Sequence, residues 1–279
     1  MLHDRHLAFV KTQGTPKGAE TAGAEPAPVM SVRGLSLASK GRPLIDDVTF
    51  DLFPNEVLAF IGRAGGGKSI LMRSLARMEQ LGRSPARSGQ ILFQGENLLC
   101  PKTDLPPLRR HLALVAQETN PFPLSIWDNI AYGIKLNRLA RTKGLIADLI
   151  EDSLRRAQLW DLVKDQLHTT LGTELDGSQR RQLCIARALA LDPKVMLIDR
   201  PTSAGDRMSF TLTLDLVAEL RKSMAIVLVA HSLENAAHMA DRVAFFDKGR
   251  IVELDTAEMI FTNARDPETR AFLEQSTYM

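Results

Sequence analysis

The chain has 279 residues and a formal net charge of +2, a balance that gives no reason to expect nucleic acid or a membrane surface as a partner. Its length suits one large α/β domain or two subdomains, and its 44% hydrophobic and 24% charged residues are ordinary for a globular protein. Cys100 and Cys184 are far apart and indicate neither a metal site nor a disulfide framework, so a reduced cytosolic compartment is the default expectation.

Membrane-spanning and secretory segments are not indicated by the sequence. No apolar run approaches the ~18 residues of a spanning helix, and residues 7–10 are too short for a signal-peptide core. We therefore expect a soluble or peripheral protein that reaches a membrane only through partner subunits.

Residues 1–29 are predicted to form a disordered tail. Residues 13–28 are rich in glycine, proline and alanine and show no apolar periodicity, so order is expected from Val29. Alternating apolar and polar residues then predict a strand over residues 48–53, and residues 90–94 predict another.

Residues 62–69, with the sequence GRAGGGKS, fit the phosphate-binding pattern G-x-x-x-x-G-K-[ST]. The apolar run 57–61 predicts a buried strand before this loop, and residues 70–78 after it have apolar positions at helical spacing. A glycine loop between strand and helix turns backbone N–H groups toward an anion, and the helix N-terminus adds partial positive charge. Lys68 is then expected to reach the β- and γ-phosphates and Ser69 to ligate Mg²⁺; the alternative is a glycine-rich turn that binds nothing. The predicted ATP-binding residues are Gly62, Arg63, Ala64, Gly65, Gly66, Gly67, Lys68, Ser69 and Ile70.

After the phosphate loop and its flanking elements the composition of the sequence changes, and further along the chain strands and helices alternate. Residues from about 97 to 175 hold prolines, charged runs and amphipathic stretches such as 145–154, which predict a helical subdomain inserted into the sheet. The alternation that follows implies an α/β fold with a mostly parallel sheet. Helices are predicted over residues 180–191, 213–221 and from about 256 onward, and buried strands over 194–199, 225–229 and 243–246.

Asp199 ends an apolar strand downstream of the phosphate loop. A carboxylate at the carboxyl end of such a strand holds Mg²⁺, directly or through water, in nucleotide-binding sites. Many buried strands end in Asp, so a capping role is the alternative, and the upstream phosphate loop favours the metal role.

The order of these parts resembles the nucleotide-binding subunit of an ATP-binding-cassette (ABC) transporter, over roughly residues 32–254. The matching features are the phosphate loop, Gln117, a signature-like loop, Asp199, residues 203–206 and His231. The signature-like loop consists of Leu175, Asp176, Gly177, Ser178 and Gln179.

Within that superfamily the chain is most similar to the ATP-binding proteins of phosphate importers. Residues 120–133, with the sequence NPFPLSIWDNIAYG, carry this likeness, and residues 183–190 and 77–78 agree with it.

The resemblance implies a P-loop NTPase (RecA-like) α/β fold with a small antiparallel β subdomain and an inserted helical subdomain. The implied boundaries are a tail at 1–29 and an ABC nucleotide-binding domain at 30–279. Within that domain the core with its β subdomain takes 30–96 and 180–255, the helical subdomain with the signature loop 97–179, and a C-terminal helical segment 256–279.

In such proteins two subunits sandwich two ATP molecules, and each site combines the phosphate loop of one chain with the signature loop of the other. By resemblance Gln117 contacts Mg²⁺ and the attacking water and senses the membrane partner, His231 contacts the γ-phosphate, and Asp206 carries the contact between opposed sites. His231 is a single histidine, and the alternative is that its role is purely structural. Implied metal ligands are Ser69, Gln117 and Asp199.

The implied cofactors are ATP and Mg²⁺. The implied partners are a second nucleotide-binding subunit, in a homo- or heterodimer, transmembrane permease subunits and, indirectly, a periplasmic or extracellular phosphate-binding protein. Nucleic acid is not expected. The implied location is the cytoplasmic face of the cell membrane.

Arg200 stands where relatives usually place the Glu that polarises the attacking water. Arginine is permanently protonated and cannot accept a proton, and the loss of a positioned base typically costs about 10²–10⁴-fold in rate. Arg200 either pairs with the γ-phosphate and strengthens ATP binding, or faces solvent or an acidic neighbour in a protein whose function has drifted.

The signature-like loop also departs from the usual Leu-Ser-Gly-Gly-Gln. Asp176 would place a carboxylate near the γ-phosphate, and two like charges ~4 Å apart repel by about 4 kcal/mol at an effective dielectric of about 20. Ser178 adds a Cβ where backbone approaches closely. Relatives commonly stack adenine on an aromatic near residues 38–39, where this chain has Ala38 and Ser39; such stacking is worth roughly 1–3 kcal/mol.

These departures affect both nucleotide sites of any dimer. Arg200 alters the site built on this chain's own phosphate loop, and Asp176 alters the site built on the partner's phosphate loop. Weak hydrolysis is therefore expected. Three functions compete: an energy-coupling ATPase subunit of a phosphate-type importer, a non-hydrolysing regulatory or scaffold subunit, and a soluble cassette ATPase without a membrane partner.

Overall fold

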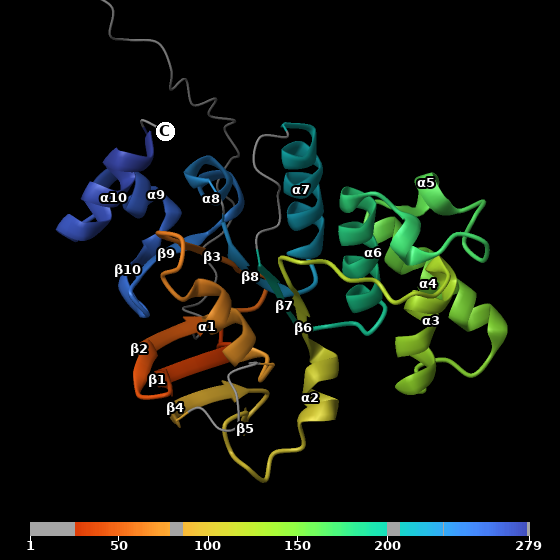
Figure 1. The fold of residues 1–279 in the computed structure, drawn as a ribbon, viewed down its shortest axis with the longest axis horizontal. Coiled ribbons are helices and arrows are strands. Elements are labelled where there is room, and N and C mark those ends of the chain that lie inside the picture. Colours follow the sequence, from red (N-terminus) through yellow and green to blue (C-terminus); the bar gives the residue numbers. More distant parts are fainter. Residues whose placement is uncertain (1–25, 79–85, 200–206, 231, 278–279) are drawn as a thin grey trace, which may run out of the picture.

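The computed structural model describes residues 26–78, 86–199, 207–230 and 232–277. A six-stranded sheet lies at the centre of the fold, a four-stranded sheet lies to one side of it, and a group of helices lies to the other (Figure 1). Within these residues, no helix combines the length and apolar character needed to cross a membrane.

The larger sheet has the strand order β10-β9-β3-β8-β7-β6. All neighbouring pairs from β9 to β6 are parallel, and β10 is an antiparallel edge strand beside β9. Its three central strands are buried along their whole length, as expected for a parallel sheet covered on both faces. The strands are β3 (Val57–Ile61), β6 (Leu112–Val115), β7 (Val195–Asp199), β8 (Ala225–Val229), β9 (Arg242–Asp247) and β10 (Arg250–Thr256).

The smaller sheet is antiparallel, with the order β2-β1-β4-β5. Its inner face shares one hydrophobic core with helix α1 and with one face of the larger sheet, through buried side chains such as Phe60 and Leu71. Its strands are β1 (Met30–Ser39), β2 (Arg42–Leu52), β4 (Ala86–Phe93) and β5 (Glu96–Asn97).

Helices from α3 onward cover the opposite face of the larger sheet and form a second core with it, in which α6 packs on α3 and α4. Asn129 of α3 is fully buried and holds the loop that precedes this helix, because its side-chain amide bonds backbone groups of Phe122, Leu124 and Ser125. The helices are α1 (Lys68–Leu75), α2 (Leu105–His111), α3 (Ile126–Leu136), α4 (Lys143–Arg156), α5 (Trp160–Val163), the 3-10 turn η1 (Gly172–Glu174), α6 (Gly177–Leu189), α7 (Arg207–Leu220), α8 (Leu233–Met239), α9 (Ala257–Asn263) and α10 (Pro267–Thr277).

The predicted α/β fold with a mostly parallel sheet, a small antiparallel sheet and inserted helices is confirmed. The boundaries of the helical subdomain stay a prediction, but residues 97–179 are not helical throughout. β6 lies inside this range and extends the larger sheet by pairing in parallel with β7, Leu112 opposite Val195 and Val115 opposite Ile198.

The phosphate loop is held against the β9–β10 hairpin by close backbone packing. Gly62 has φ 137°, and a Cβ added there would lie 2.0 Å from the carbonyl oxygen of Phe246. The N–H of Gly249 donates to the carbonyl of Gly66 at 2.9 Å, and Arg63 pairs with the buried Asp247 at 3.3 Å. The loop geometry therefore depends on a neighbouring strand far away in the sequence.

We expect Gly62→Ala to destabilise the fold, because the added methyl group has no space and the backbone conformation is one that L residues rarely adopt. The free energy of unfolding should fall by about 2 kcal/mol or more, measured by urea denaturation. Gly144→Ala on α4 is the matched control. Its methyl group would meet nothing within 4 Å, so this variant should be neutral or slightly stabilising. Equal losses in the two variants would contradict the packing argument.

Candidate functional site

The phosphate loop and the start of α1 line a cavity of about 130 Å³. Gly67, the residue before α1, has φ 105° and no side chain to cap the helix. The first backbone N–H groups of α1 have no partners within the helix itself, so an anion is a suitable partner for them. Gly65, Gly66, Gly67, Lys68, Ser69, Ile70 and Val229 line the cavity.

Lys68 is buried although it is charged, with 8% of the residue exposed. Its Nζ donates to the carbonyl oxygens of Gly62 at 2.6 Å and Arg63 at 2.7 Å. The ammonium group is thus folded back over the loop, beside the space where a phosphate would sit.

Asp199 lies at the carboxyl end of β7, opposite Val229 of β8. Because Val229 lines the cavity, the register places Asp199 at the same sheet edge as the phosphate loop. Asp199 is 2% exposed, and its Oδ1 is buried without a hydrogen-bond partner among the described residues. A buried carboxylate oxygen without a partner is costly, so it fits a cation or a cation-bound water as its missing partner.

Asp199 and Ser69 are therefore suitable residues to hold Mg²⁺ together with nucleotide oxygens. The described residues contain no group of three His, Cys, Asp or Glu side chains able to hold a metal by themselves. Mg²⁺ is usually bound by one or two carboxylates together with substrate phosphates and waters.

Gln117 follows β6 and is exposed at the same sheet edge. Arg181 of α6 reaches it, and the Nη2 of Arg181 donates to the Gln117 carbonyl oxygen at 3.1 Å. Burial lowers the pKa of Arg181, while the thiol of Cys184 and the carboxylate of Asp199 act in the opposite direction. The guanidinium remains charged at any working pH. Sequence reasoning missed Arg181, whose only signal was its place two residues after the signature loop.

The signature-like loop begins α6, and Asp176 is the N-cap of this helix. Its Oδ1 accepts from the N–H of Gln179 at 2.8 Å, and the Gln179 Oε1 accepts from the N–H of Asp176 at 3.4 Å. This reciprocal capping box gives Asp176 a structural role that the sequence comparison with Leu-Ser-Gly-Gly-Gln did not predict. Leu175 is buried, whereas Asp176, Gly177 and Ser178 are exposed.

The signature loop and the phosphate loop precede two helices, α6 and α1, that pack on different elements of the fold. α6 packs on α3, α4 and β6, whereas α1 packs on β2 and β7. Three predicted site residues, Arg200, Asp206 and His231, lie outside the described residues. Ala38 and Ser39 lie at the end of β1, opposite Pro43 and Arg42.

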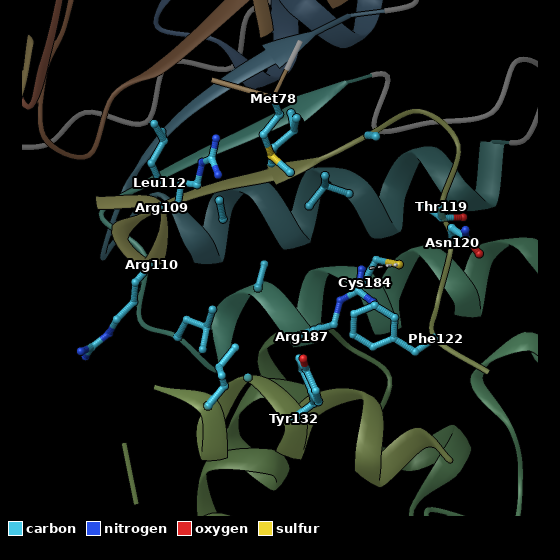
Figure 2. A pocket seen from close by; sticks show the side chains of 18 of the residues that line it. Met78, Arg109, Arg110, Leu112, Thr119, Asn120, Phe122, Tyr132, Cys184 and Arg187 are labelled. Atoms are coloured by element: carbon cyan, nitrogen blue, oxygen red, sulfur yellow. Dashed lines mark hydrogen bonds between the residues drawn. The ribbon is translucent and has the colours of Figure 1, made fainter. Parts of the chain in front are cut away.

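A second hollow, of about 410 Å³, lies between α2, β6, α3 and α6, and is shown in Figure 2. The guanidinium carbon of Arg187 lies 4.4 Å from the ring centroid of Phe122, and the rings of Phe122 and Tyr132 meet edge to face at 5.6 Å. Burial raises the pKa of the Cys184 thiol, which also faces this groove. Four of the eight large apolar side chains that are exposed in the described residues line it, namely Met78, Phe122, Tyr132 and Leu136.

A glycine phosphate loop before α1, with a buried aspartate at the end of another parallel strand of the same sheet, defines a P-loop nucleotide-binding protein. The sequence profile of the family described as ABC transporter matches residues 45–203, and the chain belongs to that family.

Curated relatives agree with this assignment. The "Phosphate import ATP-binding protein PstB 1" of Streptococcus pyogenes serotype M3 is 37% identical over 246 residues, covering 88% of this chain and 97% of the relative. The protein of the same name from serotype M4 is also 37% identical, covering 88% and 96%. The chain is thus an ABC transporter ATP-binding subunit that resembles these phosphate import proteins.

Solved structures show the same fold. The cbiO1 protein of Clostridium perfringens, part of the ABC transporter complex cbiONQ, has a TM-score of 0.72 at 22% identity, covering 85% of this chain and 91% of its own. The ATP-binding cassette MJ0796, in a dimeric post-hydrolysis state bound to ADP and Pi, has a TM-score of 0.70 at 20% identity, covering 82% and 98%.

We expect Asp176→Ala to destabilise the protein by about 1 kcal/mol, because the first turn of α6 loses the acceptor for the Gln179 N–H. Asp176→Ser keeps a capping oxygen and should stay close to the parent stability. Urea denaturation of both variants checks the difference. If Asp176→Ser were as destabilising as Asp176→Ala, helix capping would not explain the contribution of Asp176 to stability.

Proposed function

We propose that this chain is the energy-coupling ATP-binding subunit of a phosphate importer and binds Mg-ATP at the interface of a cassette dimer. The names of the relatives at 37% identity support the phosphate assignment. Nucleotide binding is supported by the intact loop, by the buried Lys68 and by the Asp199 oxygen, which has no hydrogen-bond partner among the described residues.

The single observation that carries the coupling role is the position of the segment 116–122. At one end it follows β6 beside Asp199, and Gln117 is held there by Arg181. At the other end Phe122 lines the apolar groove (Figure 2). One short segment therefore borders the nucleotide site and a surface suited to a partner.

At the nucleotide site Lys68 and the N-terminus of α1 bind the β- and γ-phosphates, and Ser69, Asp199 and Gln117 hold the metal. When bound, Mg²⁺ neutralises phosphate charge and orients the phosphate oxygens. The signature loop of a second subunit covers the nucleotide. Its exposed position at the start of α6 is suited to that contact.

The partner that we assign to the groove is a helical segment of a transmembrane permease subunit. Exposed apolar side chains gathered on one face mark interaction sites. Arg109, Arg110 and Arg187 also line the groove, against one acidic residue, Glu118, so a carboxylate on the partner segment would be favoured. Such a complex would lie on the cytoplasmic face of the membrane and would receive phosphate from an extracellular or periplasmic binding protein.

Hydrolysis is expected to be slow, because Arg200 replaces the carboxylate that polarises water and Asp176 adds negative charge to the signature loop. A non-hydrolysing regulatory or scaffold subunit of the same transporter is the second candidate, and these two residues favour it. The apolar groove argues against a cassette ATPase without a membrane partner.

We expect purified protein to bind Mg-ATP and to turn it over slowly, and Arg200→Glu to raise turnover by about tenfold or more because a base is restored. Lys68→Ala removes the phosphate contact and serves as the inactive control. Steady-state phosphate release measures each rate. Wild-type turnover equal to that of Lys68→Ala, with ATP binding intact, would favour the non-hydrolysing role. If Arg200→Glu alone has no effect, combining it with Asp176→Ser separates the two lesions.

Leu136→Glu should abolish co-purification with the permease subunits, because it places a charge on a side chain that lines the groove and is 68% exposed. Leu145→Glu, on α4 outside the groove and 54% exposed, is the matched control and should leave the complex intact. Both variants should bind ATP as the parent does. If neither variant loses the complex, or if both lose it equally, the groove is not the docking site.

A further inference from the structure

A buried carboxylate at the end of β9 lies against the phosphate loop. Asp247 is the last residue of that strand and is 4% exposed. Its Oδ2 accepts from the Nη1 of Arg63 at 3.3 Å, and a Cβ added to Gly66 would lie 3.8 Å from its Oδ1. The nucleotide cavity itself is lined by residues 65–70 and Val229. Arg63 and Asp247 therefore act on the cavity only through the loop.

The position of Asp247 is fixed by a tight turn. Lys248 and Gly249 connect β9 to β10 and both have positive φ, 47° and 86°, as in the type I′ turns of two-residue hairpins. The Gly249 N–H donates to the Gly66 carbonyl at 2.9 Å, and the Gly249 carbonyl accepts from the N–H of Asp46 at 2.8 Å. The hairpin is thus held on both sides, and Asp247 is a rigid point of attachment.

Arg63 connects this point to the hydrogen bonds that shape the loop. Its carbonyl oxygen accepts from the Nζ of Lys68 at 2.7 Å and from the N–H of Gly66 at 3.2 Å. Residues 65–67 are all glycines, which impose no conformation of their own. The Arg63 side chain is 47% exposed, so its ion pair rather than burial fixes it. The place of the Lys68 ammonium group therefore depends on where Arg63 is held.

The ion pair has two opposite effects on ATP binding. A buried carboxylate without a cation is costly, so Asp247 favours the loop conformation in which Arg63 reaches it. A loop already held in its binding conformation loses less conformational freedom when the ligand binds, which raises affinity. The negative charge of Asp247 near the loop, by contrast, repels the phosphates of ATP. Removal of that charge therefore shows which effect is larger.

We propose that Asp247 is a positioning residue of the nucleotide site, and that its ion pair with Arg63 holds the phosphate loop in the conformation that receives the phosphates of Mg-ATP. The inference rests on the proposed ATP binding and deepens it, because it assigns a role to a side chain 184 positions further along the chain than Arg63.

The test is isothermal titration calorimetry of the full chain with Mg-ATP, with urea denaturation of each variant in parallel. Asp247→Asn keeps the size of the side chain and should weaken Mg-ATP binding by about tenfold, as should Arg63→Gln. Arg63→Lys keeps the charge and should stay closer to wild type. The double variant Arg63→Gln/Asp247→Asn should bind no more weakly than either single variant, because all three lose the same interaction.

Arg33→Gln is the matched control. It removes the same charge from an ion pair on β1, where Arg33 contacts Asp51 at 2.6 Å, and should leave Mg-ATP affinity unchanged. An equal loss of affinity in Arg33→Gln and Arg63→Gln would overturn the proposal. Unchanged or tighter binding by Asp247→Asn would also overturn it, because repulsion alone predicts tighter binding and a purely structural ion pair predicts lower stability with unchanged affinity.

Asp247→Asn decides the matter if Arg63→Gln fails to fold, since the half-exposed arginine can exchange its partner for water. If the wild type binds Mg-ATP and Asp247→Asn binds it equally well, the role of Asp247 is overturned and the proposed function stands. If wild-type binding is indistinguishable from that of Lys68→Ala, ATP binding itself is overturned and the inference with it.

Discussion

The nucleotide site depends on one backbone constraint, the absence of space for a side chain where the phosphate loop passes the end of β9. A Cβ on Gly62 would lie 2.0 Å from the Phe246 carbonyl oxygen, and the Gly249 N–H bonds the Gly66 carbonyl. This contact fixes where the loop leaves β3 and hence where α1 begins. The loop can therefore face the ends of β8 and β7, and Asp199 shares an edge with it because of strand order alone.

The same sheet edge concentrates charge in a place with little water. Lys68 and Asp199 are both buried, and Arg181 reaches the edge from a helix that packs elsewhere. Burial of single charges is unfavourable, so each of these groups needs a partner, and the loop carbonyls serve Lys68. For Asp199 the natural partners are cations.

Local patterns predicted the parts of the fold that are defined by neighbours in sequence. The strand at residues 225–229 has the bounds that were predicted, and the strand, loop and helix around Lys68 follow directly from residue spacing. β6 was missed because it has four residues in a proline-rich stretch, and its partner β7 comes about eighty residues later. Arg181 and the groove were missed for the same reason, since contacts between distant segments leave no periodic signal. The capping role of Asp176 could have been predicted, because Gln179 stands at the N3 position.

The proposed separation of ATP binding from ATP hydrolysis has a thermodynamic consequence for the groove. The segment 116–122 borders both Asp199 and the apolar surface, so any nucleotide-dependent change in its position alters the fit of a partner. Linkage requires that the partner then alters nucleotide affinity by the same factor, whether or not the γ-phosphate is cleaved. Slow hydrolysis at a site with Arg200 would lengthen the ATP-bound state without removing this coupling. Under the proposed function, the departures in the catalytic motifs would set how fast the subunit resets, while the groove and the phosphate loop would decide whether nucleotide binding is coupled to a partner.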